Sequence, residues 1–267
     1  VKQLLALVLV ICLAPAACAP GPLAPRPGAG LANHCVATVR ELDRLRAPHK
    51  RVPEYLTAAN PAKRGGEFDA NTYFTVLPHL RLPEGRVLDW VMLWGGMGAE
   101  PVLYVRDATA APFATYDEYR GAGGTAIAAD PAGEALSQVA TDDSPEGYLE
   151  LAILHVVAVD FYRYWHAGYN DWRVACDRRQ LDGIAKDIAT EWASVLAGGS
   201  SGSPYEPRIT GEALRPGVEL DDNAATVTLA TFTKWGGLYR STVRFARRMP
   251  HLYEEIQSEL LEAWRLP

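Results

Sequence analysis

The stretch Ser144–Cys176, SPEGYLELAILHVVAVDFYRYWHAGYNDWRVAC, is the longest segment of this 267-residue chain that reads as a single element. Ser144 is a favourable helix N-cap, and Pro145 suits the first helical position. The residues that follow are apolar on almost every side of a helix, which predicts a buried central helix ending near His166. Four polar or charged residues interrupt the apolar run: Glu150, His155, Asp160 and Arg163. They exclude a membrane-spanning helix.

Four aromatic or imidazole side chains would share one stripe of this helix: Tyr148, His155, Tyr162 and His166. His155 and His166 would lie roughly 16 Å apart along the axis, too far to bind one metal ion. Tyr162 and His166 are one turn apart and are candidates for a catalytic pair in a cleft. The alternative is that these side chains have buried rings and satisfied polar tips.

Asp160 is a third candidate, because a carboxylate in so apolar a run must be paired or protonated. Pairing with an arginine is the structural explanation, and we prefer it to a catalytic role. No metal-binding, dinucleotide-binding or Walker pattern is found along the chain, so the sequence predicts neither a metal site nor a cofactor.

The first 17 residues, VKQLLALVLVICLAPAA, have the composition of an export signal: Lys2, an apolar core, then small residues. Pro15-Ala16-Ala17-Cys18 resembles the end of bacterial lipoprotein signals, which close on a lipidated cysteine. The resemblance implies cleavage after Ala17 and lipidation of Cys18. Ordinary signal cleavage at Ala14-Pro15-Ala16 is the alternative.

Residues 18–30 are rich in Pro and Gly and predict a semi-extended tether between the anchor and a folded domain. We expect an exported, membrane-anchored lipoprotein that faces the periplasm or the cell surface. After export, Cys35 and Cys176 remain for a disulfide bond, and we predict that they pair.

The rest of the chain, 31–267, shows no clear break in composition and is expected to form one domain. Its predicted class is α+β, with one antiparallel sheet built from two β regions. Strands are expected at 71–82, 86–93, 101–106, 225–235 and 238–245, and helices at 31–47, 144–166, 178–196 and 250–264.

The net charge of −6 argues against nucleic-acid binding. One local basic segment, Lys234–His251, stands out, and on a strand its Arg240 and Arg244 would share one face near Trp235. Two arginines on one face can bind a phosphate or a carboxylate. The alternative is a solvated face paired with neighbouring acids.

We therefore expect a lipid-anchored binding or structural module of the cell envelope, with an anionic ligand or an envelope protein as partner. The alternative is a hydrolase or metal-dependent enzyme. Its site would combine Tyr162 and His166 with ligands from elsewhere, such as His79 or His251.

Overall fold

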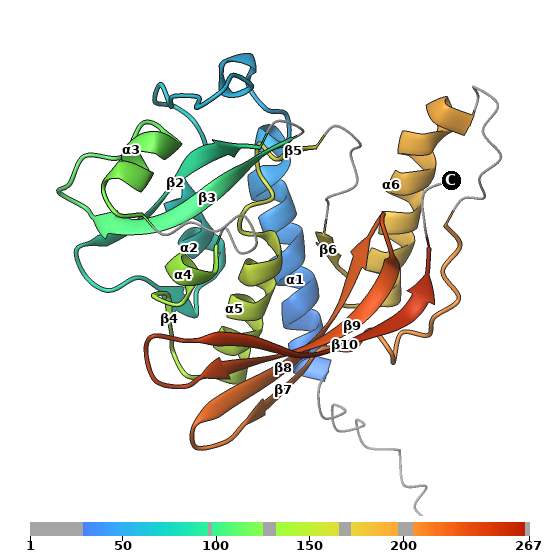
Figure 1. Ribbon diagram of the computed structural model, residues 1–267. Coiled ribbons are helices and arrows are strands. Elements are labelled where there is room, and N and C mark those ends of the chain that lie inside the picture. The colour runs from blue at the N-terminus through green and yellow to red at the C-terminus, as the bar shows by residue number, and fades with distance from the viewer. Residues whose placement is uncertain (1–28, 96–97, 125–131, 166–171, 197–204, 265–267) are drawn as a thin grey trace, which may run out of the picture.

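The computed structural model describes residues 29–95, 98–124, 132–165, 172–196 and 205–264. Helix α5 (Pro145–Val157) lies at the centre of the molecule (Figure 1). It begins as predicted, because the Ser144 hydroxyl accepts a hydrogen bond from the Gly147 amide at 3.0 Å and Pro145 follows the cap. Nine of its 13 residues are buried.

Helix α5 ends at Val157, so the prediction that it continues to His166 is wrong. Two carbonyl groups at its end are satisfied by side chains from other elements. Arg46 donates to the Val157 carbonyl at 3.2 Å, and the Tyr73 hydroxyl donates to the Ala158 carbonyl at 3.0 Å. Tyr162, a little further on, has a φ of 50°, which no right-handed helix accommodates. Tertiary contacts therefore replace the hydrogen bonds that a longer helix would make.

Helix α1 (Ala29–Arg46) packs beside α5, and helix α6 (Arg178–Leu196) lies at the far end of the molecule (Figure 1). Both were predicted, although α1 begins within the expected tether. The remaining helical elements are short: η1 (Ala47–His49), η2 (Glu54–Leu56), η3 (Ala70–Thr72), α2 (Tyr73–Val76), α3 (Tyr116–Gly121) and α4 (Gly133–Leu136). Within the described ranges, no helix is long and apolar enough to span a bilayer.

Three antiparallel sheets are present among the described residues. The five-stranded sheet consists of β6 (Trp172–Val174), β7 (Gly217–Leu220), β8 (Ala224–Thr233), β9 (Gly237–Ala246) and β10 (Tyr253–Ala263). The three-stranded sheet consists of β2 (Arg86–Trp94), β3 (Gly98–Asp107) and β5 (Tyr164–Trp165), and β1 (Leu80–Arg81) pairs with β4 (Ala140–Thr141). The α+β class is confirmed, but the two β regions form separate sheets instead of one.

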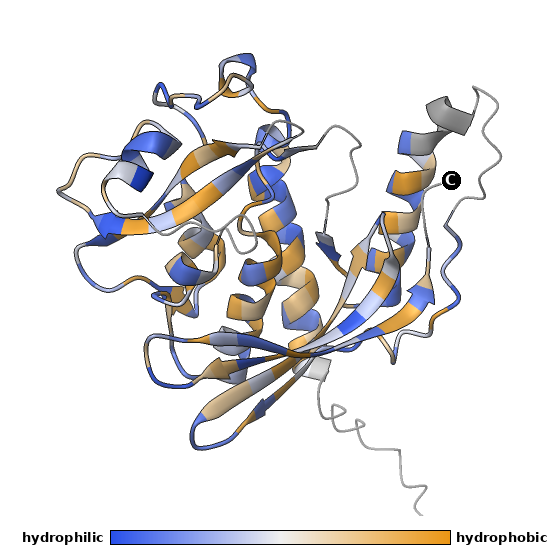
Figure 2. Ribbon diagram, viewed as in Figure 1, coloured by the Kyte–Doolittle hydropathy of each residue, from blue (hydrophilic) through white to orange (hydrophobic). Residues whose placement is uncertain are grey.

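Strand β8 buries opposite faces at its two ends. Ala225, Val227 and Leu229 belong to the main core around α5, whereas Ala230 and Phe232 pack in a second core with α6. Side chains alternate between the two faces along a strand. The residues in these two cores are odd-numbered in the first half and even-numbered in the second, so the buried side moves from one face of the sheet to the other. In Figure 2, α5 is apolar over most of its length, whereas the peripheral α3 is hydrophilic.

The segment 250–264, predicted to be a helix, forms strand β10 instead. Its apolar residues recur at helical spacing, but β9 presents a ten-residue edge, and β10 pairs with it from Tyr253↔Phe245 to Ala263↔Gly237. The hydrogen bonds that β10 makes with this edge outweigh its weak local preference for a helix. The periodicity of one segment does not show which other segment it will pair with.

The predicted strand 71–82 is also wrong over most of its length, since 71–76 is helical and only Leu80–Arg81 forms a strand. The Asp69 carboxylate accepts a hydrogen bond from the Asn71 amide at 2.9 Å and starts a turn that continues into α2. Tyr73 and Leu77 then reach the core one turn apart. A side-chain cap thus overrides the strand preference of the aromatic and β-branched residues.

The predicted disulfide bond is confirmed. Cys35 and Cys176 are bonded, with 5.8 Å between their Cα atoms. Cys35 lies in α1, and Cys176 lies between β6 and α6. The bond therefore ties α1 to the segment that leads into α6.

Candidate functional site

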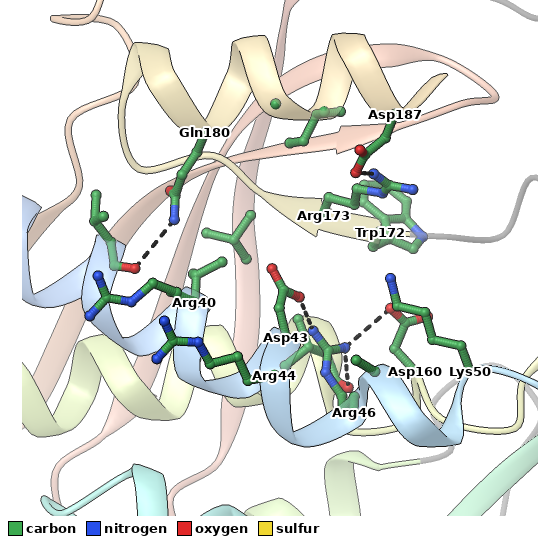
Figure 3. Close-up of a pocket in the computed structure, with 17 residues that line it drawn as sticks. Arg40, Asp43, Arg44, Arg46, Lys50, Asp160, Trp172, Arg173, Gln180 and Asp187 are labelled. Atoms are coloured by element: carbon green, nitrogen blue, oxygen red, sulfur yellow. Dashed lines mark hydrogen bonds and ion pairs between the residues drawn. The ribbon is translucent and has the colours of Figure 1, made fainter. Parts of the chain in front are cut away.

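A cleft of about 550 Å³ lies between α1, β6 and α6 (Figure 3). The disulfide bond joins the two sides of this region, because Cys35 precedes Val36 of the lining and Cys176 follows Val174. The size falls within the range of small-molecule sites. The cleft is thus held by a covalent link between segments that are 141 residues apart in the sequence.

The inner surface of the cleft is apolar. It is lined by Val36, Val39, Val157, Val174 and Ile184. Trp172, at the start of β6, is 40% exposed and presents a large aromatic surface at the edge (Figure 3). An apolar group that entered the cleft would leave water for contact with these side chains.

Gly183 keeps the cleft open on the α6 side. It lies within the helix and lines the cleft, and a Cβ atom built on it would meet nothing within 4 Å. A glycine inside a helix costs about 0.5–1 kcal/mol relative to alanine. Any larger side chain at this position would begin in the space of the cleft.

Five cationic and three acidic side chains line the cleft: Arg40, Arg44, Arg46, Lys50, Arg173, Asp43, Asp160 and Asp187. Arg46 is buried and structural, because it bonds Asp43 at 2.9 Å and Asp160 at 3.2 Å (Figure 3). Arg173 bonds Asp187 at 3.0 Å. These contacts neutralise the interior of the cleft.

The exposed cations are on α1 and just beyond its end. Arg40 and Arg44 are one turn apart and both bond Glu41, which does not line the cleft, at 3.3 Å and 2.7 Å. Exposed pairs of this kind contribute little and break readily. Together with the exposed Lys50, Arg40 and Arg44 form a positively charged rim along the α1 side of the cleft (Figure 3). This rim can attract an anion.

Asp160, one of the three catalytic candidates, is the partner of Arg46, which confirms the structural pairing that we preferred. Tyr162 is not on the central helix. Its hydroxyl lies 2.9 Å from Nδ1 of His49. His166 lies outside the described residues. The predicted stripe of Tyr148, His155, Tyr162 and His166 on one helix is therefore wrong, because the helix ends before Tyr162.

His155 is half-buried, and its Nε2 atom is fully enclosed. Its ring stacks on Tyr253, with 4.6 Å between the ring centroids. Burial lowers the pKa of His155 to about 3. Its Nε2 atom has no hydrogen-bond partner among the described residues. His155 is thus a neutral aromatic contact between α5 and β10.

None of the predicted anion-binding residues lines the cleft. Arg240 and Arg244 share one face of β9, opposite Glu259 and Glu254 of β10. Trp235 is 63% exposed in the turn between β8 and β9. Anion binding by this strand face stays a prediction.

His79 and His251, the other histidines of the enzyme hypothesis, lie in different surroundings. His251 is buried, and its Nδ1 atom lies 2.7 Å from the Ala246 carbonyl oxygen. His79 lies beside His34, with 5.3 Å between the ring centroids.

Sequence reasoning missed the cleft. Arg40 and Arg44 recur at a helical interval, and Gly183 interrupts an otherwise good helix, but neither signal shows that α1 and α6 are neighbours. The regular spacing of two arginines is also typical of an ordinary solvated helix face.

No protein-family model matches the chain, and neither a characterised protein nor a solved structure shows significant similarity to it. Its function is therefore inferred from its own geometry.

Proposed function

We propose that this protein is an exported, lipid-anchored protein of the cell envelope that binds an anionic amphiphile in the cleft between α1 and α6. The ligand would have an apolar body and a carboxylate or phosphate head group. The observation that carries the proposal is the combination of an apolar interior, a cationic α1 rim and a glycine that leaves the space free.

The two parts of the cleft match the two parts of such a ligand. Burial of the apolar body is favourable by about 25 cal/mol for each Å² of apolar surface removed from water. Arg40 and Arg44 can form charge-assisted hydrogen bonds with the head group once they leave Glu41. A positive rim on a chain of net charge −6 attracts an anion locally without making the whole protein basic.

The proposed anchor would hold the cleft near a membrane. Helix α1 begins at Ala29, so a lipid on Cys18 would be joined to a wall of the cleft by a short tether. Eleven extended residues span at most roughly 40 Å. The cleft would thus stay within reach of amphiphiles that leave the bilayer.

The test is a calorimetric titration in which decanoate is added to the mature chain anchored in lipid nanodiscs. Empty nanodiscs provide the blank. Decyltrimethylammonium tests the preference for an anion. We expect Gly183→Phe to abolish binding, since the ring would occupy the cleft, and Arg40→Gln/Arg44→Gln to weaken it at least tenfold.

The matched control is Arg240→Gln/Arg244→Gln, which removes the same charge from β9 and should leave binding unchanged. Unchanged binding by the Gly183→Phe variant would refute the cleft as the site. Loss of binding only in the β9 variant would assign the ligand to the strand face instead.

A further inference from the structure

Three side chains from separate elements converge beside α5. His34 comes from α1, Glu150 from α5 and His79 from the loop between α2 and β1. One ligand atom of each lies within 4.8 Å of the other two. The Nε2 atom of His34 lies 2.9 Å from Oε1 of Glu150, and the His79 amide donates to Oε2 at 3.1 Å.

Glu150 is fully buried, with a side-chain exposure of 0%. Among the residues that the structure describes, neither lysine nor arginine forms an ion pair with it. A buried carboxylate with only imidazole and amide partners is a costly feature for a core, because burial of a charge requires compensation.

His79 is oriented in the way that metal-binding histidines are. Its Nδ1 atom lies 2.7 Å from the carboxylate of Asp142, which can only accept when ionised, so Nδ1 carries a proton and, in the neutral ring, Nε2 is the nitrogen that can bind a metal ion. Asp142 is itself held by the amide and hydroxyl of Ser144, at 3.1 Å and 2.5 Å. A carboxylate behind a histidine fixes the tautomer and the ring direction of a metal ligand.

The cluster is also open on one side. The side chains of His34 and His79 are 24% and 30% exposed, whereas Glu150 lies beneath them. Glu146, one turn before Glu150, adds negative charge that acts on both histidines. A cation that entered from solvent would meet two imidazoles and then a buried carboxylate.

We propose that His34, His79 and Glu150 form a binding site for a divalent transition metal ion such as Zn²⁺, with Asp142 as the residue that positions His79. Imidazole nitrogens and a carboxylate oxygen are ligands that zinc takes at about 2.0–2.2 Å, which separates neighbouring ligands by roughly 3.3 Å. The three atoms, which lie within 4.8 Å of one another, would have to approach by up to about 1.5 Å to reach that distance.

Three protein ligands with a solvent-facing side leave a fourth position for water or another ligand. This arrangement is typical of catalytic zinc sites, whereas structural sites take four protein ligands. The proposal does not depend on the amphiphile cleft, because none of these residues lines it. The competing explanation is a purely structural hydrogen-bond cluster.

The experiment uses the mature chain in nanodiscs, stripped with a chelator and titrated with Zn²⁺ against a competing chromophoric chelator. We expect one tight site per chain. Substitution of Co²⁺ should give visible absorption bands of a low-coordinate N/O site. His34→Gln, His79→Gln and Glu150→Gln should each weaken Zn²⁺ binding more than Asp142→Asn, for which loss of a positioning partner predicts a 10–100-fold decrease.

His49→Gln is the matched control. His49 also bonds a partner side chain, Tyr162, but it lies outside the cluster, so its variant should keep the affinity. Failure of the chain to bind one Zn²⁺ would overturn the proposal, and so would binding that survives in both His34→Gln and His79→Gln. Because these two histidines are partly exposed, their variants remain informative even if Glu150→Gln fails to fold.

Discussion

Arg46 of α1 and Asp160, three residues beyond the end of α5, form an ion pair with 3.2 Å between Nη1 and Oδ2. The side chain of Arg46 is only 5% exposed, and the same nitrogen donates to the Val157 carbonyl. One guanidinium therefore ends the central helix and pairs with the carboxylate that follows it. This contact also forms part of the wall of the cleft.

We predict that Arg46→Ala lowers the free energy of unfolding by about 3 kcal/mol, because it removes a buried guanidinium that pairs with the Asp160 carboxylate and donates to the Val157 carbonyl. Arg44→Ala, two residues away and exposed, should change it by no more than about 0.5 kcal/mol. Urea unfolding of both variants provides the measurement. Equal effects of the two substitutions would contradict a structural role for Arg46.

The disulfide bond closes a loop with a sequence separation of 141 residues. On the chain-entropy model, its removal should cost about 5 kcal/mol of stability. Cys35→Ser/Cys176→Ser should therefore show a much lower urea midpoint than the oxidised chain. Reduction of the native chain should have the same effect and leave the double variant unchanged. A native midpoint that is insensitive to reductant would count against the bond.

Gly183→Ala should stabilise the protein by about 0.5–1 kcal/mol, because alanine is the better helix former. The new methyl group meets nothing within 4 Å, so no clash offsets this gain. Thermal unfolding of the variant and of the native chain tests the prediction. A lower melting temperature would contradict the prediction and would mean that the helix is strained near Gly183.

His155 predicts a specific dependence of stability on pH. Its pKa is about 3 in the folded chain, below the ordinary value of 6.5, so the unfolded chain binds the proton first. The contribution of His155 is therefore constant above pH 6.5 and is lost as the pH falls toward 3. Between these values, the free energy of unfolding should fall by about 1.4 kcal/mol per pH unit.

His155→Phe isolates this effect, because it retains a ring against Tyr253 but does not titrate. Urea unfolding at pH 7, 6 and 5 should show that the native chain loses stability relative to the variant at each step. Parallel curves for the two proteins would show that His155 is not held in its neutral form.

Local signals were enough for several features. The Ser144 cap and Pro145 place the start of α5, and the alternation of Thr with apolar residues identifies β8. Both depend on contacts within a few residues, which a sequence displays directly. The Cys35–Cys176 bond was also predictable, because the expected signal cleavage and lipidation would leave only these two cysteines.

The candidate sites were not predictable in the same way. His34, His79 and Glu150 are 45 and 71 residues apart and fit no metal-binding spacing, and the cleft requires α1 and α6 to be neighbours. Asp160 was the exception, since a lone carboxylate in an apolar run indicates a partner without saying which one.

The sequence by itself thus determined the α+β class, the start of the central helix and the cysteine pair, because these follow from local chemistry and composition. Only the tertiary structure decided where that helix ends, that 253–263 is a strand and which polar side chains meet. Arg46 caps a carbonyl 111 residues away, and β9 offers its edge to a segment with helical periodicity. Long-range hydrogen bonds of this kind outweigh local preferences that differ by less than about 1 kcal/mol per residue.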